Sequence, residues 1–501
     1  MANSTFATDN VKGLIDRAKA KLQEALALHQ QGHWAQAKAI YRSVLQAHPR
    51  HFDALHWLDV LAHQTKDHVN AVGLMRQAIA INPDTAAVYS NLGVALQALN
   101  RFDEALACYD QAIQLGDDAA ARCNRGSLLV NLGKFEDAVE TFSRLLETAP
   151  AYPFAQGHLL HTKMLCCDWT GLPELADAIK QGIAARKKSA EPFGYQGISC
   201  SEQDLRACAE IYAADKFPMP NITLCKTTAR RPGKIRIGYL AGEFREQATA
   251  VLMTGVWEQH DKSRHYTEKI VYLPHSYQPN DRKRQADHQA FSREALGLPR
   301  AGFVFCCFNN NYKITPGTFA VWMRILNRVD GSLLWLLEDN PTAAINLRHE
   351  AAARGVSADR LIFAKRVSLP AHLARHRAAD LFLDTPPYNA HTTASDALWT
   401  GLPVLTCVGA TFAGRVAASL LNAMALPELI TQSEAQYESL AVELAADADK
   451  LSRIKHKLER NRLTTPLFDT ALFTRHIETA YTQMVERSQA DLPPAHMAVE
   501  E

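Results

Sequence analysis

Short apolar runs alternate with amphipathic stretches through the last 200 residues of the chain. Apolar runs of strand length fall at 303–308, 332–337, 361–363, 380–383 and 403–406. Stretches with helical periodicity fall between or after them, at 316–328, 342–354, 371–377, 392–400 and 413–424. Because the strands are apolar on both faces and alternate with helices, this pattern predicts a parallel α/β sheet covered by helices on both sides.

The first third of the chain follows a different rule, with similar residues recurring about every 34 positions. Small residues share one register and large apolar residues stand four positions later in each unit: Ala37, Ala71, Ala105 and Ala138, followed by Tyr41, Met75, Tyr109 and Phe142. A period of 34 with these positions is typical of the tetratricopeptide repeat. We therefore predict an α-solenoid over residues 13–152, with four units and a concave groove that binds extended peptides.

Two asparagines are candidates for contacts in that groove. Asn91 and Asn124 occupy the same register in the first helices of units three and four, where an amide can bond a peptide backbone. Trp57 stands at the equivalent place in unit two, so any asparagine ladder is short. The alternative is that both are ordinary solvated helix residues.

Polar side chains gather where the predicted strands of the α/β region end. They are Asn310 and Lys313, then His372 and Arg375, and finally His391, Thr392, Thr393 and Asp396. Ligands of parallel sheets bind at the carboxyl ends of the strands, and a helix that starts at two threonines offers free N–H groups to an anion. Asp396, one turn further on, suits a sugar diol. The pattern predicts a nucleotide or nucleotide-sugar site, whereas each residue taken alone has an ordinary solvated or helix-capping explanation.

Composition narrows the classes of function. The net charge is +1 over 501 residues, which favours neither nucleic acid nor an anionic membrane as partner. We expect neither a signal peptide nor a membrane span, because the chain has no apolar run of about 20 residues. The ten cysteines include no CxxC pair, so we expect reduced thiols, no metal site and a cytoplasmic location.

Several segments resemble the protein O-GlcNAc transferases, which are GT-B glycosyltransferases with N-terminal tetratricopeptide repeats. The segments are 236–239, 266–274, 307–314, 334–337, 384–396 and 414–419. The resemblance implies that UDP-GlcNAc is the donor, that Ser or Thr of a protein is the acceptor, and that no cofactor is needed. By position, it assigns Asn310 and Lys313 to the phosphates, with Lys313 stabilising the leaving group. It assigns His372 and Arg375 to the uracil, His391, Thr392 and Thr393 to the pyrophosphate, and Asp396 to the ribose.

The same resemblance divides the chain into five parts. After the repeats we expect a helical connector (153–226), a shortened N-terminal GT-B lobe (227–299), a C-terminal UDP-sugar lobe (300–487) and a flexible tail (488–501). Gln247 stands where the family carries a histidine, and a glutamine cannot act as a base. One interpretation is an O-GlcNAc-transferase-like enzyme with weak or lost activity and an unknown general base. The other is an inactive protein that binds UDP or peptides.

Overall fold

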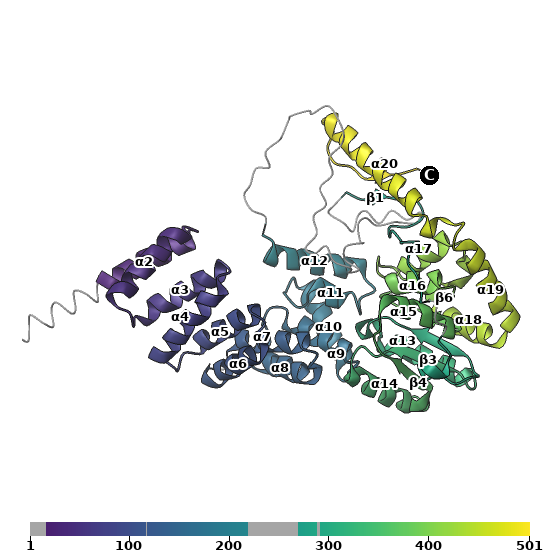
Figure 1. Cartoon of the computed structure of the whole chain (residues 1–501), viewed down its shortest axis with the longest axis horizontal. Coiled ribbons are helices and arrows are strands. Elements are labelled where there is room, and N and C mark those ends of the chain that lie inside the picture. Colours follow the sequence, from purple (N-terminus) through teal and green to yellow (C-terminus); the bar gives the residue numbers. More distant parts are fainter. Residues whose placement is uncertain (1–16, 117, 219–268, 288–290, 501) are drawn as a thin grey trace, which may run out of the picture. The chain divides into compact units, whose positions relative to one another are not determined.

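The computed structural model describes residues 17–116, 118–218, 269–287 and 291–500. The chain separates into two compact units, with the division after Ala155. Each unit has its own arrangement of elements (Figure 1).

The first unit is a row of antiparallel helices, which confirms the predicted solenoid. Residues 17–30 are helical and precede α2 (Trp34–Ala47). Three further helix pairs follow: α3 (Phe52–Gln64) with α4 (His68–Ile81), α5 (Ala86–Ala98) with α6 (Phe102–Gly116), and α7 (Ala119–Asn131) with α8 (Phe135–Thr148). The alanines of the shared register are fully buried, as are the large residues four positions later.

Close helix packing explains the recurring small residues. A Cβ atom added to Gly93 would lie 2.5 Å from the ring of Tyr109, and one added to Gly126 would lie 2.7 Å from the ring of Phe142. These distances are shorter than any van der Waals contact, so a side chain at either glycine would force the helix pair apart.

Asp59 occupies the same register in unit two, 34 positions before Gly93, and its side chain is fully buried. His56 Nδ1 lies 3.5 Å from its carboxylate. Burial raises the pKa of Asp59, and His56 opposes that rise. A carboxylate therefore stands in the core where the neighbouring units place glycine.

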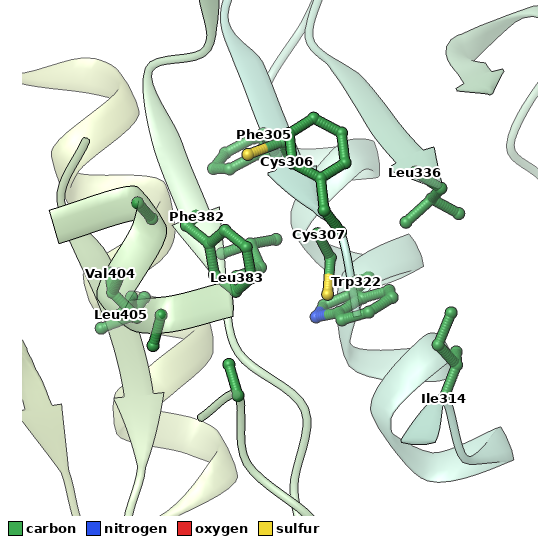
Figure 2. Close-up of a cluster of buried hydrophobic side chains, with 14 of the residues drawn as sticks. Phe305, Cys306, Cys307, Ile314, Trp322, Leu336, Phe382, Leu383, Val404 and Leu405 are labelled. Carbon is green, nitrogen blue, oxygen red and sulfur yellow. The ribbon is translucent and has the colours of Figure 1, made fainter. Parts of the chain in front are cut away.

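The second unit is built on a six-stranded parallel sheet with the order β4-β3-β2-β5-β6-β7. The strands are β2 (Val304–Cys307), β3 (Leu333–Leu337), β4 (Leu361–Ala364), β5 (Leu381–Leu383), β6 (Val404–Cys407) and β7 (Ile430–Thr431). Every residue of β2, β3 and β5 is buried, so both faces of the central strands are covered. Figure 2 shows Cys307 of β2 directed toward the indole of Trp322.

The helices of this unit follow the predicted alternation to within a few residues. They are α13 (Pro316–Arg328), α14 (Pro341–Ala353), α15 (Leu369–Arg375), α16 (Thr392–Trp399), α17 (Val416–Ala423), α18 (Glu434–Ala446), α19 (Ala448–Asn461) and α20 (Thr470–Gln489). Pro316 and Pro341 begin α13 and α14, where a missing N–H costs nothing. The predicted parallel α/β architecture is confirmed.

The segment predicted as a connector packs into the same core as the sheet. Its helices are α9 (Ala155–Leu165), α10 (Leu172–Ala184), α11 (Pro192–Tyr195) and α12 (Glu202–Lys216). Asn340 and Asn346 of the sheet domain donate hydrogen bonds of 2.9 Å to the carbonyl oxygens of Leu165 and Cys166, at the end of α9. These helices are therefore part of the second unit and share its hydrophobic core.

A small two-stranded sheet joins the part before residue 300 to the C-terminal residues. β1 (Val271–Tyr272) pairs in parallel with β8 (Met497–Ala498), and both lie beside α20 (Figure 1). Part of the segment expected to be a flexible tail, 488–501, thus lies in this sheet, where Val499 is buried. Residues 227–268 of the expected N-terminal lobe, which include Gln247, lie outside the described residues. Within the described ranges, no helix combines the length and the apolar character that crossing a membrane would require.

Candidate functional site

The strand order places the carboxyl ends of β2 and β5 side by side at a topological switch point, where the connections to the next strands lead away in opposite directions. From β2 the chain proceeds outward to β3 and β4, and from β5 it proceeds the other way to β6 and β7. In open α/β sheets, ligands bind outside the carboxyl ends of the strands at this switch point. The loops after β2 and β5 carry most of the residues predicted from sequence.

Lys313 is the buried cation of this site. It lies in a short turn after β2, where its Nζ donates a hydrogen bond of 2.8 Å to the carbonyl oxygen of Asn389 and lies 4.0 Å from the ring centroid of Tyr388. Burial lowers the pKa of Lys313 to about 8, and the charge of Asp384 opposes that fall. At neutral pH the amine is mostly an ammonium, and a bound anion would stabilise that form further.

Asp384, which immediately follows β5, holds the loop that faces Lys313. Its carboxylate accepts hydrogen bonds from the Thr406 hydroxyl at 2.6 Å and from the N–H groups of Ala390 at 2.6 Å and Thr385 at 2.8 Å. The side chain is fully buried, and this burial raises the pKa of Asp384 to about 6. The carboxylate therefore shapes residues 385–390 and supplies a negative charge near Lys313.

Helix α16 begins at Thr392, as the sequence predicted. The side chain of His391, at the N-cap, makes no capping hydrogen bond. In α13 and α14, by contrast, Thr315 and Asn340 cap the helix with their side chains. No N-cap side chain therefore competes with an anion for the first N–H groups of α16, where the positive end of the helix dipole also lies.

His391 is neutral at this helix start. Burial, followed by the charge of Lys313, lowers the pKa of His391 to about 3. Its Nδ1 lies 3.2 Å from the Tyr277 hydroxyl, and its buried Nε2 has no hydrogen-bond partner among the described residues. When the Tyr277 O–H donates to Nδ1, Nε2 carries the proton and can donate to a phosphate oxygen.

Asn309 links the two loops through side-chain hydrogen bonds. Its Oδ1 accepts from the Thr393 hydroxyl, and its Nδ2 donates to Thr385 Oγ1 at 2.8 Å. The next residue, Asn310, is the one predicted from the sequence; it is exposed and accepts a hydrogen bond of 3.3 Å from Arg366. A phosphate contact by Asn310 stays a prediction, whereas Asn309 is buried and bonded to residues on both sides of the loop after β5.

Asp396 lies one turn into α16 and forms an ion pair with Arg284. Burial raises the pKa of Asp396, and Arg284 opposes the rise. The predicted ribose contact is therefore a carboxylate that already has a cationic partner within the protein.

His372 and Arg375 of α15 lie against Phe308, the residue after β2. The guanidinium of Arg375 lies 4.5 Å from the Phe308 ring centroid, and its Nη2 lies 2.5 Å from His372 Nδ1. Burial lowers the pKa of His372 to about 2, so the imidazole is neutral and accepts this hydrogen bond. The two residues predicted to contact the uracil are thus joined by a hydrogen bond, and they lie on the β4 side of the switch point.

Asn91 and Asn124 belong to the first unit, where they lie half-buried on α5 and α7. Their role in peptide binding stays a prediction.

The structure adds Tyr277, Arg284, Asn309 and Asp384 to the predicted site. Asn309 and Asp384 could have been predicted from the sequence, because each is a polar residue that closely follows a buried strand. Tyr277 and Arg284 carried no local signal, because their partners lie 114 and 112 residues further along the chain.

Two parts of the chain match known protein families. Residues 283–477 match glycosyl transferase family 41, and residues 22–86 and 90–153 match the tetratricopeptide repeat. Over 280 residues, 54% of the chain, it is 36% identical to a probable UDP-N-acetylglucosamine–peptide N-acetylglucosaminyltransferase, SEC, of Arabidopsis thaliana. It is 37% identical over 206 residues, 41% of the chain, to the Caenorhabditis elegans UDP-N-acetylglucosamine–peptide N-acetylglucosaminyltransferase.

The matched regions span 29% of the length of the Arabidopsis protein and 18% of that of the C. elegans protein. Among solved structures, a mutant O-GlcNAc transferase of Thermobaculum terrenum aligns with 95% of this chain and 99% of its own, at 21% identity and a TM-score of 0.44. Residues 283–477 therefore match a glycosyl transferase family 41 domain, and with its repeats the chain is similar to the O-GlcNAc transferases.

Proposed function

We propose that the chain binds UDP-GlcNAc at the switch point between β2 and β5 and transfers GlcNAc to Ser or Thr of a protein. The observation that carries this proposal is the buried ammonium of Lys313 beside the uncapped start of α16. Both features attract a diphosphate, and both relatives described above are named as UDP-GlcNAc–peptide transferases.

In this reaction the acceptor hydroxyl oxygen attacks the anomeric carbon with inversion. The bond from that carbon to the diphosphate oxygen breaks, and its electron pair leaves with UDP. Lys313, the Nε2–H of His391 and the N–H groups at Thr392 and Thr393 would stabilise the negative charge that develops there. These groups take the part that a metal ion plays in other transferases, so we propose that no metal is needed. The proton of the acceptor hydroxyl goes to a general base, a role that Gln247 cannot fill.

We place the acceptor peptide in the groove of the first unit. Asn91 and Asn124 lie on the first helices of their repeats, which line the concave face in solenoids of this kind. Amide side chains bind the peptide backbone without selecting its sequence, which suits an enzyme with many acceptors.

A second candidate is a UDP-binding protein that performs no transfer. Gln247 in place of a histidine and the short stretch before residue 300 favour this alternative, since a positioned general base contributes about 10²–10⁴-fold to a rate. On the same grounds, we expect any transfer to be weak.

A transfer assay separates the two candidates. Radiolabelled UDP-GlcNAc and a broad peptide library are incubated with the wild-type chain, with Lys313→Ala and with Lys450→Ala. Lys450 is a partly exposed lysine of α19 that pairs with Glu443, away from the candidate site. Label on peptides that is lost only in Lys313→Ala supports the transferase. UDP binding without label on any peptide would establish the second candidate, and absence of both would refute the site itself.

A further inference from the structure

A short segment before residue 300 contacts the first half of α16 at several positions. The hydroxyl of Tyr277 lies 3.2 Å from His391, at the start of α16. One turn later, Ser395 donates a hydrogen bond to the side chain of Asn280. The segment thus braces the helix whose N-terminus faces the candidate diphosphate position.

Arg284 makes the most extensive of these contacts. Its Nη1 binds Asp396 Oδ1, its Nη2 donates to Ser395 Oγ at 3.2 Å, and its Nε donates to the Asp281 carbonyl oxygen at 3.0 Å. Its own carbonyl oxygen accepts a hydrogen bond of 3.0 Å from Trp399 Nε1, at the other end of α16. Since all three nitrogens of the guanidinium are engaged, the plane of this group has one orientation.

This orientation determines what Asp396 can offer a ligand. The Asp396 side chain is 11% exposed and that of Arg284 is 16% exposed. A carboxylate has room for about four hydrogen bonds, so the ion pair through Oδ1 leaves acceptor capacity for the hydroxyls of a sugar. Without a cation beside it, a carboxylate at this depth is driven toward its protonated form, which accepts hydrogen bonds less well.

We propose that Arg284 is a positioning residue for ribose recognition, which holds the Asp396 carboxylate charged and aimed at the ribose hydroxyls of the nucleotide. The inference rests on the proposed UDP site, and it assigns to that site a residue from outside the parallel sheet. Arg284 acts through Asp396 and need not contact the nucleotide.

The test measures how strongly the protein distinguishes ribose from deoxyribose. Calorimetric titrations with UDP, 2′-deoxy-UDP and 3′-deoxy-UDP are run on the wild-type full-length chain and on Arg284→Met. In the wild type, at least one deoxy form should bind about tenfold or more weakly than UDP, because a charge-assisted hydrogen bond is lost. In Arg284→Met this preference should shrink to about twofold, while in Arg282→Met, an exposed arginine of the same segment, it should stay at the wild-type level.

Two further variants keep the result interpretable. Arg284→Lys retains a charge without the planar fork, so we expect partial recovery of the preference. By itself, Asp396→Asn should abolish the preference for ribose over deoxyribose. Adding Arg284→Met should lower this preference no further, because both changes act through one carboxylate. A melting curve for each variant shows whether it folds. If Arg284→Met does not fold, the inference is tested with Arg284→Lys and with the double variant Arg284→Lys/Asp396→Asn.

An undiminished ribose preference in folded Arg284 variants would overturn the inference while leaving UDP binding established. Additive losses in the double variant would also overturn it. No UDP binding by the wild-type chain would refute the proposed function and this inference together.

Discussion

The ammonium of Lys313 donates a 2.8 Å hydrogen bond to the carbonyl oxygen of Asn389, two residues before His391. This bond joins the loop after β2 to the loop after β5 at the point where the strand order reverses. It places a buried cation and the start of α16 around one position, where a diphosphate would satisfy both.

Replacing Lys313 with Ala should weaken UDP binding about tenfold to a hundredfold. The variant loses one charged hydrogen-bond donor, which is worth about 1.5–3 kcal/mol in a desolvated site. Calorimetric titration measures the change, with Lys450→Ala as the matched lysine control. Equal affinities for wild type and Lys313→Ala would show that the diphosphate binds elsewhere.

UDP affinity should fall as the pH rises through about 8. The pKa of Lys313 in the free protein is about 8, so the ammonium that attracts the diphosphate is present below that pH and lost above it. Binding of UDP favours the charged form, and the affinity should decline by up to tenfold per pH unit above 8.

The window from pH 7 to 8.5 isolates this titration, because the pKa of Arg375, about 10, lies above it and the uracil N–H also loses its proton only above it. The terminal phosphate of UDP ionises near pH 6. The pKa values of Asp384, about 6, and His391, about 3, also lie below the window. In Lys313→Arg the guanidinium stays charged, so the slope should disappear wherever this variant still binds. A flat wild-type profile would contradict the assignment.

Asp59→Ala should stabilise the first unit by about 1–3 kcal/mol at pH 7, because it removes a buried carboxylate with little compensation. The pKa of Asp59 is raised in the folded state, so its group contributes stability at low pH that is lost as the pH rises through the folded value. The advantage of the variant should therefore shrink as the pH is lowered toward 4.

Urea denaturation at pH 7 and pH 4.5 checks both statements about Asp59. The exposed Asp103, at the start of α6, gives the control, and its replacement by Ala should cost a few tenths of a kcal/mol. A loss of stability in Asp59→Ala at pH 7 would mean that the carboxylate is well compensated in the core.

A fragment ending at Ala155 should fold by itself as a helical solenoid. The division between the two units falls there, and repeats of this kind are stabilised by contacts with their neighbours. Circular dichroism should show a helical spectrum with one cooperative melting transition. A random-coil spectrum would indicate that the repeats depend on the second unit.

The sequence alone determined those features that depend on short-range periodicity. The register of Ala37 and its equivalents predicted the solenoid, because helix pairs of one length must bury the same positions. The start of α16 at Thr392 and the cation at Lys313 could also be predicted from the sequence, because each follows closely after an apolar strand.

The tertiary structure decided which side chains meet, because pairing between residues 76 or more positions apart leaves no local pattern. It chose the buried Asn309 over its exposed neighbour Asn310, and it gave Asp396 the partner Arg284. It also placed the segment 156–216 in the core of the second unit and paired the C-terminal residues with β1. In each case the deciding interaction is burial or a hydrogen bond between distant segments, which only the folded chain brings into contact.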